Sequence, residues 1–263
     1  MPNTNLSGRF QGNVVAITGA GNGIGQAVAS AFVREGASVY GLDIDANGLE
    51  STARRLQPGG GRFVGITADV CKPEDIALAI KRVLSEAHRI DVLVNNAGIN
   101  MAKRIADLEI ADWDNVFDTN LTSVYRFSKG FWPTFLAQRS GIIINVSSVM
   151  GQVGGISSPA YCATKAGIIM LSRCLAKDGA QYGIRVNSVC PGYIDTPIME
   201  RLLQTMTDPV GARQDLVNRM PLGRMGSPED VAAGILFLAS KDAEYISGTE
   251  LTIDGAVTAT QID

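Results

Sequence analysis

Tyr161 and Lys165 are the residues whose types and spacing point most directly to chemistry. They stand four positions apart in the sequence Tyr161-Cys-Ala-Thr-Lys165, and residues at i and i+4 share one helix face, about 6 Å apart along the axis. An ammonium group so close to a phenol favours the phenolate, so the pKa of Tyr161 is expected to lie below its ordinary value of about 10. The tyrosine could then accept a proton from an alcohol, or donate one to a carbonyl, near neutral pH.

Ser148 precedes this pair in the segment Asn145-Val-Ser-Ser148-Val-Met150, which ends an apolar run. Its hydroxyl both donates and accepts hydrogen bonds, so it could hold a substrate oxygen beside Tyr161. A tyrosine and a lysine at this spacing are also common on helices, and a partly exposed pair without special contacts is the alternative. Their position after a predicted strand, on the sheet edge that carries the glycine turn, favours the chemical interpretation.

The glycine turn is the segment Thr18-Gly-Ala-Gly-Asn-Gly-Ile-Gly25, between an apolar run and a segment of helical periodicity over 25–35. Glycines let the backbone turn tightly and let a pyrophosphate approach the N–H groups at the positive end of a helix. A simple turn is the alternative. Because the cluster lies at a strand-to-helix junction near the start of the chain, it predicts a dinucleotide site.

Asp43 follows the second predicted strand, 18 residues after Gly25. This spacing is typical of the acid that binds the ribose hydroxyls of a dinucleotide. Its carboxylate would repel a 2′-phosphate, and neither Asn22 nor Ile44 supplies a cation to pair with one, so NAD is favoured over NADP. An ordinary acidic strand end is the alternative, and Asp45 is the second candidate for the same role.

The elements that must position these residues are visible as short runs rich in Val and Ile between segments of helical periodicity. Seven strands are expected, over 14–18, 38–42, 63–68, 92–94, 142–146, 185–189 and 251–253. Continuous apolar runs are typical of strands covered on both faces. The pattern predicts an α/β fold of the doubly wound (Rossmann) type, with a mainly parallel seven-stranded sheet, helices on both faces and one domain over 11–263. Residues 1–10 are expected to form a flexible arm, and the proline-rich stretch over 192–227 a substrate lid with a short helix or two.

Composition excludes several classes of partner. The net charge is −3 and the 23 basic residues are spread along the chain, without the basic stripe that nucleic acid or an anionic membrane requires. No stretch of about 20 apolar residues is present, and the start lacks the pattern of a secretory signal, so a cytoplasmic location is expected. Four cysteines without a Cys-x-x-Cys pair, and a single histidine, His88, indicate no metal site and no histidine-based catalysis. A small molecule is the expected partner.

Taken together, these segments resemble the short-chain dehydrogenase/reductase family, classical type, from about residue 10 onward. The resemblance is carried by Thr18-Gly-x-x-x-Gly23-x-Gly25, Asp69-Val70, Asn95-Asn-Ala-Gly98, Asn120, Ser148, Tyr161-x-x-x-Lys165, Pro191-Gly192 and Asp254-Gly255. It implies a catalytic set of Asn120, Ser148, Tyr161 and Lys165. It also implies a cofactor site that comprises Gly19, Asn22, Gly23, Ile24, Gly25, Asp43, Asp69, Val70, Asn96, Ala97, Gly98, Tyr161, Lys165, Pro191, Gly192, Ile194 and Thr196.

The resemblance further implies individual roles. Asp69 and Val70 would contact the adenine, Asn120 would hold a water that links Lys165 to solvent, and Thr196 would bind the nicotinamide carboxamide. Ser148 rather than Ser147 matches the catalytic serine, because it precedes the tyrosine by 13 residues. A homotetramer is also implied, with helices near 111–138 and 159–182 as its contacts.

The substrate pocket is expected to be moderately apolar with one or two polar handles. The residues expected to line it are Ser148, Met150, Gln152, Val153, Tyr193 and Met199.

The function that these features favour is NAD-dependent interconversion of a secondary alcohol, or a polyol or other hydroxy compound, and its ketone. An NADP-dependent carbonyl or 3-oxoacyl reductase is the alternative within this class. A non-catalytic NAD-binding sensor and a methyltransferase remain as alternatives from other classes. The complete set of Asn120, Ser148, Tyr161 and Lys165 disfavours both, because neither needs the tyrosine and lysine.

Overall fold

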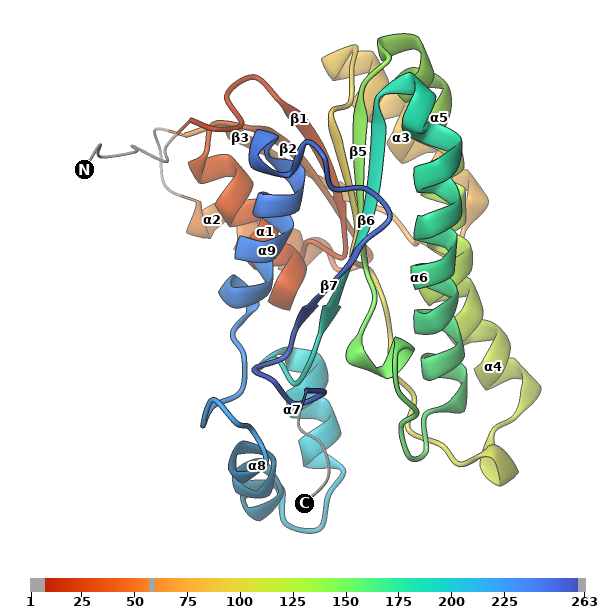
Figure 1. Ribbon diagram of the computed structural model, residues 1–263, viewed down its shortest axis with the longest axis vertical. Coiled ribbons are helices and arrows are strands. Elements are labelled where there is room, and N and C mark those ends of the chain that lie inside the picture. Colours follow the sequence, from red (N-terminus) through yellow and green to blue (C-terminus); the bar gives the residue numbers. More distant parts are fainter. Residues whose placement is uncertain (1–7, 57–59, 260–263) are drawn as a thin grey trace.

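A seven-stranded parallel sheet forms the centre of the computed structural model, which describes residues 8–56 and 60–259 (Figure 1). The strand order is β3-β2-β1-β4-β5-β6-β7, and every neighbouring pair is parallel. The strands are β1 Val14–Thr18, β2 Ser38–Asp43, β3 Arg62–Thr67, β4 Val92–Asn95, β5 Gly141–Val146, β6 Ile184–Pro191 and β7 Glu250–Ile253. The predicted fold is confirmed, and the direction of winding reverses between β1 and β4. Ligands of doubly wound sheets bind at the carboxyl ends of the strands beside such a reversal.

Helices cover both faces of the sheet (Figure 1). One face carries α1 Gly23–Arg34, α2 Ala46–Arg55 and α9 Pro228–Ala239. The other face carries α3 Pro73–Ala87, α4 Ile110–Phe117, α5 Ser123–Gln138 and α6 Pro159–Gly179. Along β1, Val15 and Ile17 belong to the core on the first face, whereas Val14 and Ala16 belong to the core on the second. This alternation explains why the strand sequence is continuously apolar.

The expected lid contains two short helices, α7 Pro197–Gln204 and α8 Pro209–Asn218. Figure 1 shows both beyond the carboxyl edge of the sheet, away from the two helical layers. Each begins with a proline at its first position, and the preceding residue, Thr196 or Asp208, caps the helix through its side chain. The two helices therefore lie where they can cover a ligand bound at this edge.

Residues 8–10 of the expected N-terminal arm pack against the domain, and residues 1–7 lie outside the described residues. Phe10 is buried and packs edge-on against Phe32 of α1, with ring centroids 4.7 Å apart. Arg9 pairs with Glu35 at 3.0 Å. Residues 8–10 are thus part of the domain, because an aromatic side chain there finds a hydrophobic contact.

His88 lies at the end of the sheet opposite the lid. It ends α3 in a left-handed conformation with φ of 58° and precedes β4. Within the described ranges, no helix is long and apolar enough to cross a membrane.

Candidate active site

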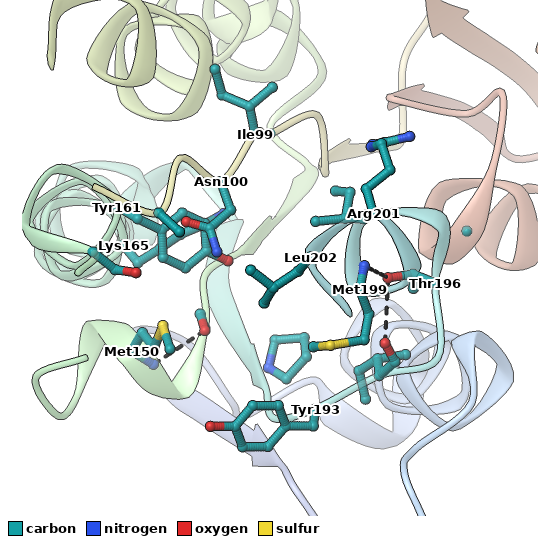
Figure 2. Close-up of a pocket in the computed structure, with 18 of the residues that line it drawn as sticks. Ile99, Asn100, Met150, Tyr161, Lys165, Tyr193, Thr196, Met199, Arg201 and Leu202 are labelled. Carbon is teal, nitrogen blue, oxygen red and sulfur yellow. Dashed lines mark hydrogen bonds between the residues drawn. The ribbon is translucent and has the colours of Figure 1, made fainter. Parts of the chain in front are cut away.

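A cavity of about 1570 Å³ opens at the carboxyl edge of the sheet. Its walls come from the ends of β1, β2, β4, β5 and β6, the start of α6, and the lid helices. Figure 2 shows Tyr161 and Lys165 on one side of this cavity and the lid residues Met199, Arg201 and Leu202 on the other. The predicted dinucleotide turn therefore shares one cavity with Ser148, Tyr161 and Lys165, three of the four predicted catalytic residues.

Helix α6 brings Tyr161 and Lys165 onto the cavity wall. It begins at Pro159, so Tyr161 lies in its first turn and Lys165 one turn later. The Nζ atom of Lys165 lies 5.4 Å from the centroid of the Tyr161 ring and donates a hydrogen bond of 2.8 Å to the carbonyl of Val146. Ser148 follows β5, accepts a hydrogen bond from the Met150 amide at 3.1 Å, and its hydroxyl acts on the Tyr161 phenol, whose pKa it lowers.

In the protein without a ligand, the pKa of Tyr161 is shifted in the direction opposite to the one expected from the sequence. Burial raises the pKa of Tyr161 to about 12, against a smaller lowering by the hydrogen bond with Ser148. Burial also lowers the pKa of Lys165 to about 8. Desolvation of the phenolate is the largest cause of this shift, and the Lys165 ammonium lies over the ring and is hydrogen-bonded to Val146. Tyr161 therefore carries its proton at neutral pH.

Ser147, the residue before Ser148, contacts the backbone of α6 and not the Tyr161 hydroxyl. The Ser147 hydroxyl donates a hydrogen bond of 2.7 Å to the Lys165 carbonyl and so ties the end of β5 to α6. This bond fixes the helix that carries the tyrosine and lysine. Ser148 instead lies on the cavity wall beside Tyr161, and its role in holding the substrate stays a prediction.

Asn120 lies behind the cavity wall. It is fully buried in a turn of π-helix, Asp118–Thr122, between α4 and α5. Its side chain accepts a hydrogen bond from the Ile99 amide at 2.8 Å and donates one to the Ile99 carbonyl at 2.9 Å and another to the Thr164 hydroxyl. The amide thus fixes the loop after β4 against α6, and the water contact implied for Asn120 stays a prediction.

The glycine turn adopts a backbone that its glycines allow. Gly19 has φ of 69° and Gly23 has φ of 53°, values in the left-handed region. A Cβ atom on Gly25 would collide with the Gly19 carbonyl. The Asn96 side chain donates to the carbonyls of Thr18 and Gly19, both at 3.0 Å, so the turn is held from β4.

The start of α1 fits the pyrophosphate of a dinucleotide. Asn22, Gly23 and Ile24 line the cavity there. The N-cap residue Asn22 makes no side-chain capping bond, and the first turn holds no acid. A helix end with free N–H groups and a positive dipole is an anion site.

Acidic side chains mark the opposite end of the cofactor site. Asp43, at the end of β2, accepts hydrogen bonds from the Gly21 amide at 2.8 Å and the Asp45 amide at 3.0 Å, and it lines the cavity beside Ile44. Asp69 lines the cavity too and accepts a hydrogen bond from the Cys71 amide.

Most of the other predicted cofactor residues also lie on the cavity wall. These are Val70, Ala97, Gly98, Pro191, Gly192, Ile194 and Thr196. Gly25 is not on the wall; it acts through the close packing of the turn. These positions are compatible with a dinucleotide extended from Asp43 to Tyr161.

Gln152 was wrongly predicted to line the substrate pocket. Its side-chain amide donates a hydrogen bond of 3.1 Å to the Thr252 hydroxyl of β7, and the residue is absent from the cavity wall. The tight turn Val149–Gly151 before it directs the side chain away. The remaining predicted substrate residues, Ser148, Met150, Val153, Tyr193 and Met199, line the cavity.

Asn100 and two arginines were missed by the sequence interpretation. Asn100 follows the Asn-Asn-Ala-Gly segment and faces the cavity beside Tyr161 (Figure 2). Its side-chain oxygen is buried without a hydrogen-bond partner in the described part of the chain. Its position after a strand end was the available signal. Arg201 and Arg219 of the lid also line the cavity, and no sequence pattern distinguishes them from surface arginines.

A phosphate-binding turn and a Tyr–Lys pair on one edge of a doubly wound sheet define the class of protein, a dinucleotide-dependent oxidoreductase. A family model described as "Enoyl-(Acyl carrier protein) reductase" matches residues 19–258. The chain belongs to the short-chain dehydrogenase/reductase family, whose members are NAD(P)-dependent oxidoreductases.

Known relatives extend over almost the whole chain. The 3-oxoacyl-[acyl-carrier-protein] reductase FabG of Thermotoga maritima is 40% identical over 249 residues, which are 95% of this chain and 99% of the relative. The 2-(S)-hydroxypropyl-CoM dehydrogenase 3 of Xanthobacter autotrophicus is 40% identical over 256 residues, 97% of this chain and 100% of the relative. The crystal structure of levodione reductase is similar with a TM-score of 0.93 and 31% identity, over 96% of this chain and 100% of that chain.

Proposed function

We propose that this protein is an NAD(H)-dependent oxidoreductase that interconverts a secondary alcohol and its ketone, with Tyr161 as the general acid and base. The observation that carries the proposal is that Ser148, Tyr161 and Lys165 line the cavity that begins at the glycine turn, with Ser148 close enough to Tyr161 to lower the pKa of its phenol. A reacting oxygen beside Ser148 and Tyr161 would contact one hydroxyl that holds it and one that exchanges a proton with it.

The residues divide the chemistry among them. A bound nicotinamide dinucleotide accepts a hydride from the alcohol carbon, or returns one to the ketone. Ser148 orients the substrate oxygen, and Tyr161 takes the hydroxyl proton in oxidation or supplies it in reduction. Lys165, held by the Val146 carbonyl, places a positive charge beside the phenol and so favours its deprotonation. The raised pKa of Tyr161 means that the ligand-free protein is already in the protonation state needed for reduction.

The preference for NAD rests on Asp43. Its carboxylate is held at the end of β2 by two backbone N–H groups. The basic residues of the described cavity wall are Lys165, Arg201 and Arg219, on α6 and the lid, so none lies on β2 or the glycine turn. A 2′-phosphate placed there would meet an anion without a compensating cation.

A panel assay tests the proposal. Secondary alcohols, polyols, hydroxysteroids and hydroxy acids are incubated with the protein and either NAD or NADP, and reduced cofactor is measured by its absorbance. We expect reduction of NAD with at least one class and a lower kcat/KM with NADP. Binding of S-adenosylmethionine without NAD binding would contradict the proposal, as would NAD binding without turnover of any alcohol or ketone.

A 3-oxoacyl reductase is the second candidate, because the Thermotoga maritima relative bears that name. This activity would use the same Tyr161 as an acid toward a 3-oxo group. Faster oxidation of NADPH than of NADH with acetoacetyl thioesters would favour it. Preference for NADH, with free alcohols as better substrates, would favour the first proposal.

We also propose that the chain forms a homotetramer through α4, α5 and α6, as the family resemblance implies. In the single chain, Tyr125 of α5 and Met170 of α6 are 48% and 55% exposed. Apolar side chains on two long neighbouring helices favour burial against another subunit. Sedimentation velocity measures the outcome: four chains are expected, and a monomer at micromolar concentration would contradict it.

A further inference from the structure

The cavity extends beyond Tyr161 to a region formed mainly by apolar side chains. Met150, Val153, Tyr193, Met199 and Leu202 line it. Two solvent-exposed arginines of the lid line the same cavity, Arg201 in α7 and Arg219 at the end of α8. In Figure 2, Arg201 lies on the side of the cavity away from Tyr161 and Lys165. Cations at the rim of this cavity are available to a bound ligand, because binding pockets use their few polar groups to orient ligands.

Neither guanidinium group has an ion-pair or hydrogen-bond partner within residues 8–56 and 60–259, although acids are close in sequence. Glu200, directly before Arg201, instead binds Arg213 at 2.9 Å, and Asp195 binds the same guanidinium at 3.0 Å. Arg224 is likewise paired, with Asp230. The lid thus pairs Arg213 with two acids while Arg201 and Arg219 face the cavity.

The net charge of this part of the wall also depends on one acid. Asp215 of α8 lines the cavity one turn before Arg219. It forms no ion pair within 4 Å with either arginine in the described chain. Two guanidinium groups and one carboxylate leave a net charge of about +1 in this part of the wall.

The cofactor has another partner for its phosphates. The start of α1, with Gly23 and Ile24 on the cavity wall, supplies N–H groups and a helix dipole for the pyrophosphate. The end where Asp43 and Asp69 lie is acidic. The arginines of α7 and α8 belong to the lid and not to the glycine turn or β2, so they are available to the substrate.

We propose that Arg201 and Arg219 form a carboxylate-binding subsite, so that the substrate is a hydroxy acid and its oxidised product an oxo acid. A guanidinium presents N–H donors that match the two oxygens of a carboxylate, and such charge-assisted pairs give both affinity and orientation. The apolar side chains contact the carbon skeleton between the two groups, while Ser148 and Tyr161 hold the hydroxyl. This inference names the substrate class and rests on the proposed function.

The first test compares acids with their uncharged methyl esters. Hydroxy acids with different separations between hydroxyl and carboxylate are assayed in pairs with NAD. We expect kcat/KM for the best acid to exceed that for its ester by roughly 10- to 100-fold, the range of one or two charge-assisted hydrogen bonds. Equal turnover of acid and ester would overturn this proposal and leave the proposed function standing.

Variants then locate the subsite. Arg201→Met and Arg219→Met should each raise KM for the acid by roughly 10-fold with kcat little changed, because the lost contact is made in both ground and transition states. Turnover of the ester should not change. Lysine at either position keeps the charge and should restore part of the affinity for the acid. Arg34→Met, which removes an exposed arginine of α1 outside the cavity wall, is the matched control and should behave like the wild type.

Binding can be measured without turnover. Calorimetric titration of the NADH-loaded protein with cyclohexanecarboxylate and with its methyl ester should show tighter binding of the acid, lost in the Arg201→Met, Arg219→Met double variant. Equal affinity for acid and ester would overturn the proposal. So would an effect of the variants on NADH affinity alone, which would assign the arginines to the cofactor. Absence of any alcohol or ketone turnover, with the charge-dependent binding intact, would instead contradict the proposed function.

Discussion

The environment of Tyr161, rather than its spacing from Lys165 alone, sets its protonation in this fold. Burial raises the pKa of the phenol to about 12 and lowers the pKa of the lysine to about 8. The sequence predicted the pair and its helix face correctly but predicted the opposite shift for the phenol. A sequence cannot show how much water remains around a side chain, and desolvation is the largest cause of both shifts.

The positions of the other site residues could be predicted from the sequence to different extents. Asp43 was predictable because its spacing from the glycine turn follows from one βαβ unit. Gln152 was misplaced because the sequence does not show the tight turn before it. Asn100 was missed because the sequence does not reveal which polar atoms will lack a partner after folding. The positions of residues that depend on the order of the elements could be predicted from the sequence. The positions of residues that depend on the direction of a side chain could not.

Cofactor selectivity should respond to Asp43. Replacing Asp43 with Ala and Ile44 with Arg removes the repelling carboxylate and supplies a cation for a 2′-phosphate. We expect the ratio of kcat/KM for NAD over NADP to fall by roughly 100-fold, because a repulsion is removed and a charge-assisted contact is added. Each tenfold change corresponds to about 1.4 kcal/mol. Steady-state kinetics with both cofactors measure the ratio. Asp45→Ala, a change of the exposed neighbouring acid, is the control, and unchanged selectivity in the double variant would show that another residue reads the ribose.

At the scale of elements, the strands were the most predictable feature. Each predicted range overlaps its observed strand, and β1 agrees at both ends, because strands buried on both faces need continuous apolar runs. The π-helix around Asn120 was not predicted. Its sequence, Asp-Thr-Asn-Leu-Thr, carries no signal that separates it from the flanking α-helices, and the hydrogen bonds of Asn120 to Ile99 become visible only when distant segments meet.

Close packing of the glycine turn against α1 gives a prediction for this element. In Gly25→Ala the added methyl collides with the Gly19 carbonyl and must push the turn away from the helix. We expect NAD affinity, measured by calorimetry, to fall by at least roughly 10-fold, because the turn sets the position of the N–H groups that bind the pyrophosphate. Gly65→Ala in β3, whose added atom would lie 3.3 Å from the Leu49 side chain and away from the cavity, should leave NAD affinity unchanged. Equal affinity of the Gly25→Ala variant and the wild type would contradict this account.

At the scale of the whole molecule, the sheet brings together residues that are far apart in the chain. The active-site cavity takes its walls from segments between Gly19 and Thr258. The order of elements and the edge where ligands bind could be predicted, since parallel strands in a doubly wound sheet leave few choices. The lid could be predicted only as a region. The packing of α7 and α8 decides which arginines of the lid pair with acids and which face the cavity. No sequence pattern indicates this packing.

The buried ammonium of Lys165 gives a pH dependence of stability for the protein without cofactor. Its pKa is about 8 in the folded chain and 10.5 when exposed, so between these values the unfolded chain holds a proton that the folded chain has lost. The free energy of unfolding should therefore rise with pH across this window, by on the order of 3 kcal/mol in total, and the contribution is lost as pH falls through 8.

Urea unfolding of the wild type and Lys165→Met at pH 7, 8, 9 and 10 measures this dependence. Taking the difference between the two proteins removes the contributions of groups that Lys165 does not influence. We expect the wild type to gain stability relative to the variant from pH 8 upward. Parallel curves would show that Lys165 keeps an ordinary pKa in the folded protein.

Substitution of one oxygen atom tests the central claim most directly. Tyr161→Phe removes the phenolic hydroxyl and keeps the ring that packs in the cavity wall. With a substrate found in the panel assay, we predict that kcat falls by roughly 100- to 10,000-fold, the contribution of a general acid or base, while NAD affinity measured by calorimetry stays near that of the wild type. Retention of kcat within a few-fold of the wild type would show that another group transfers the proton and would contradict the account.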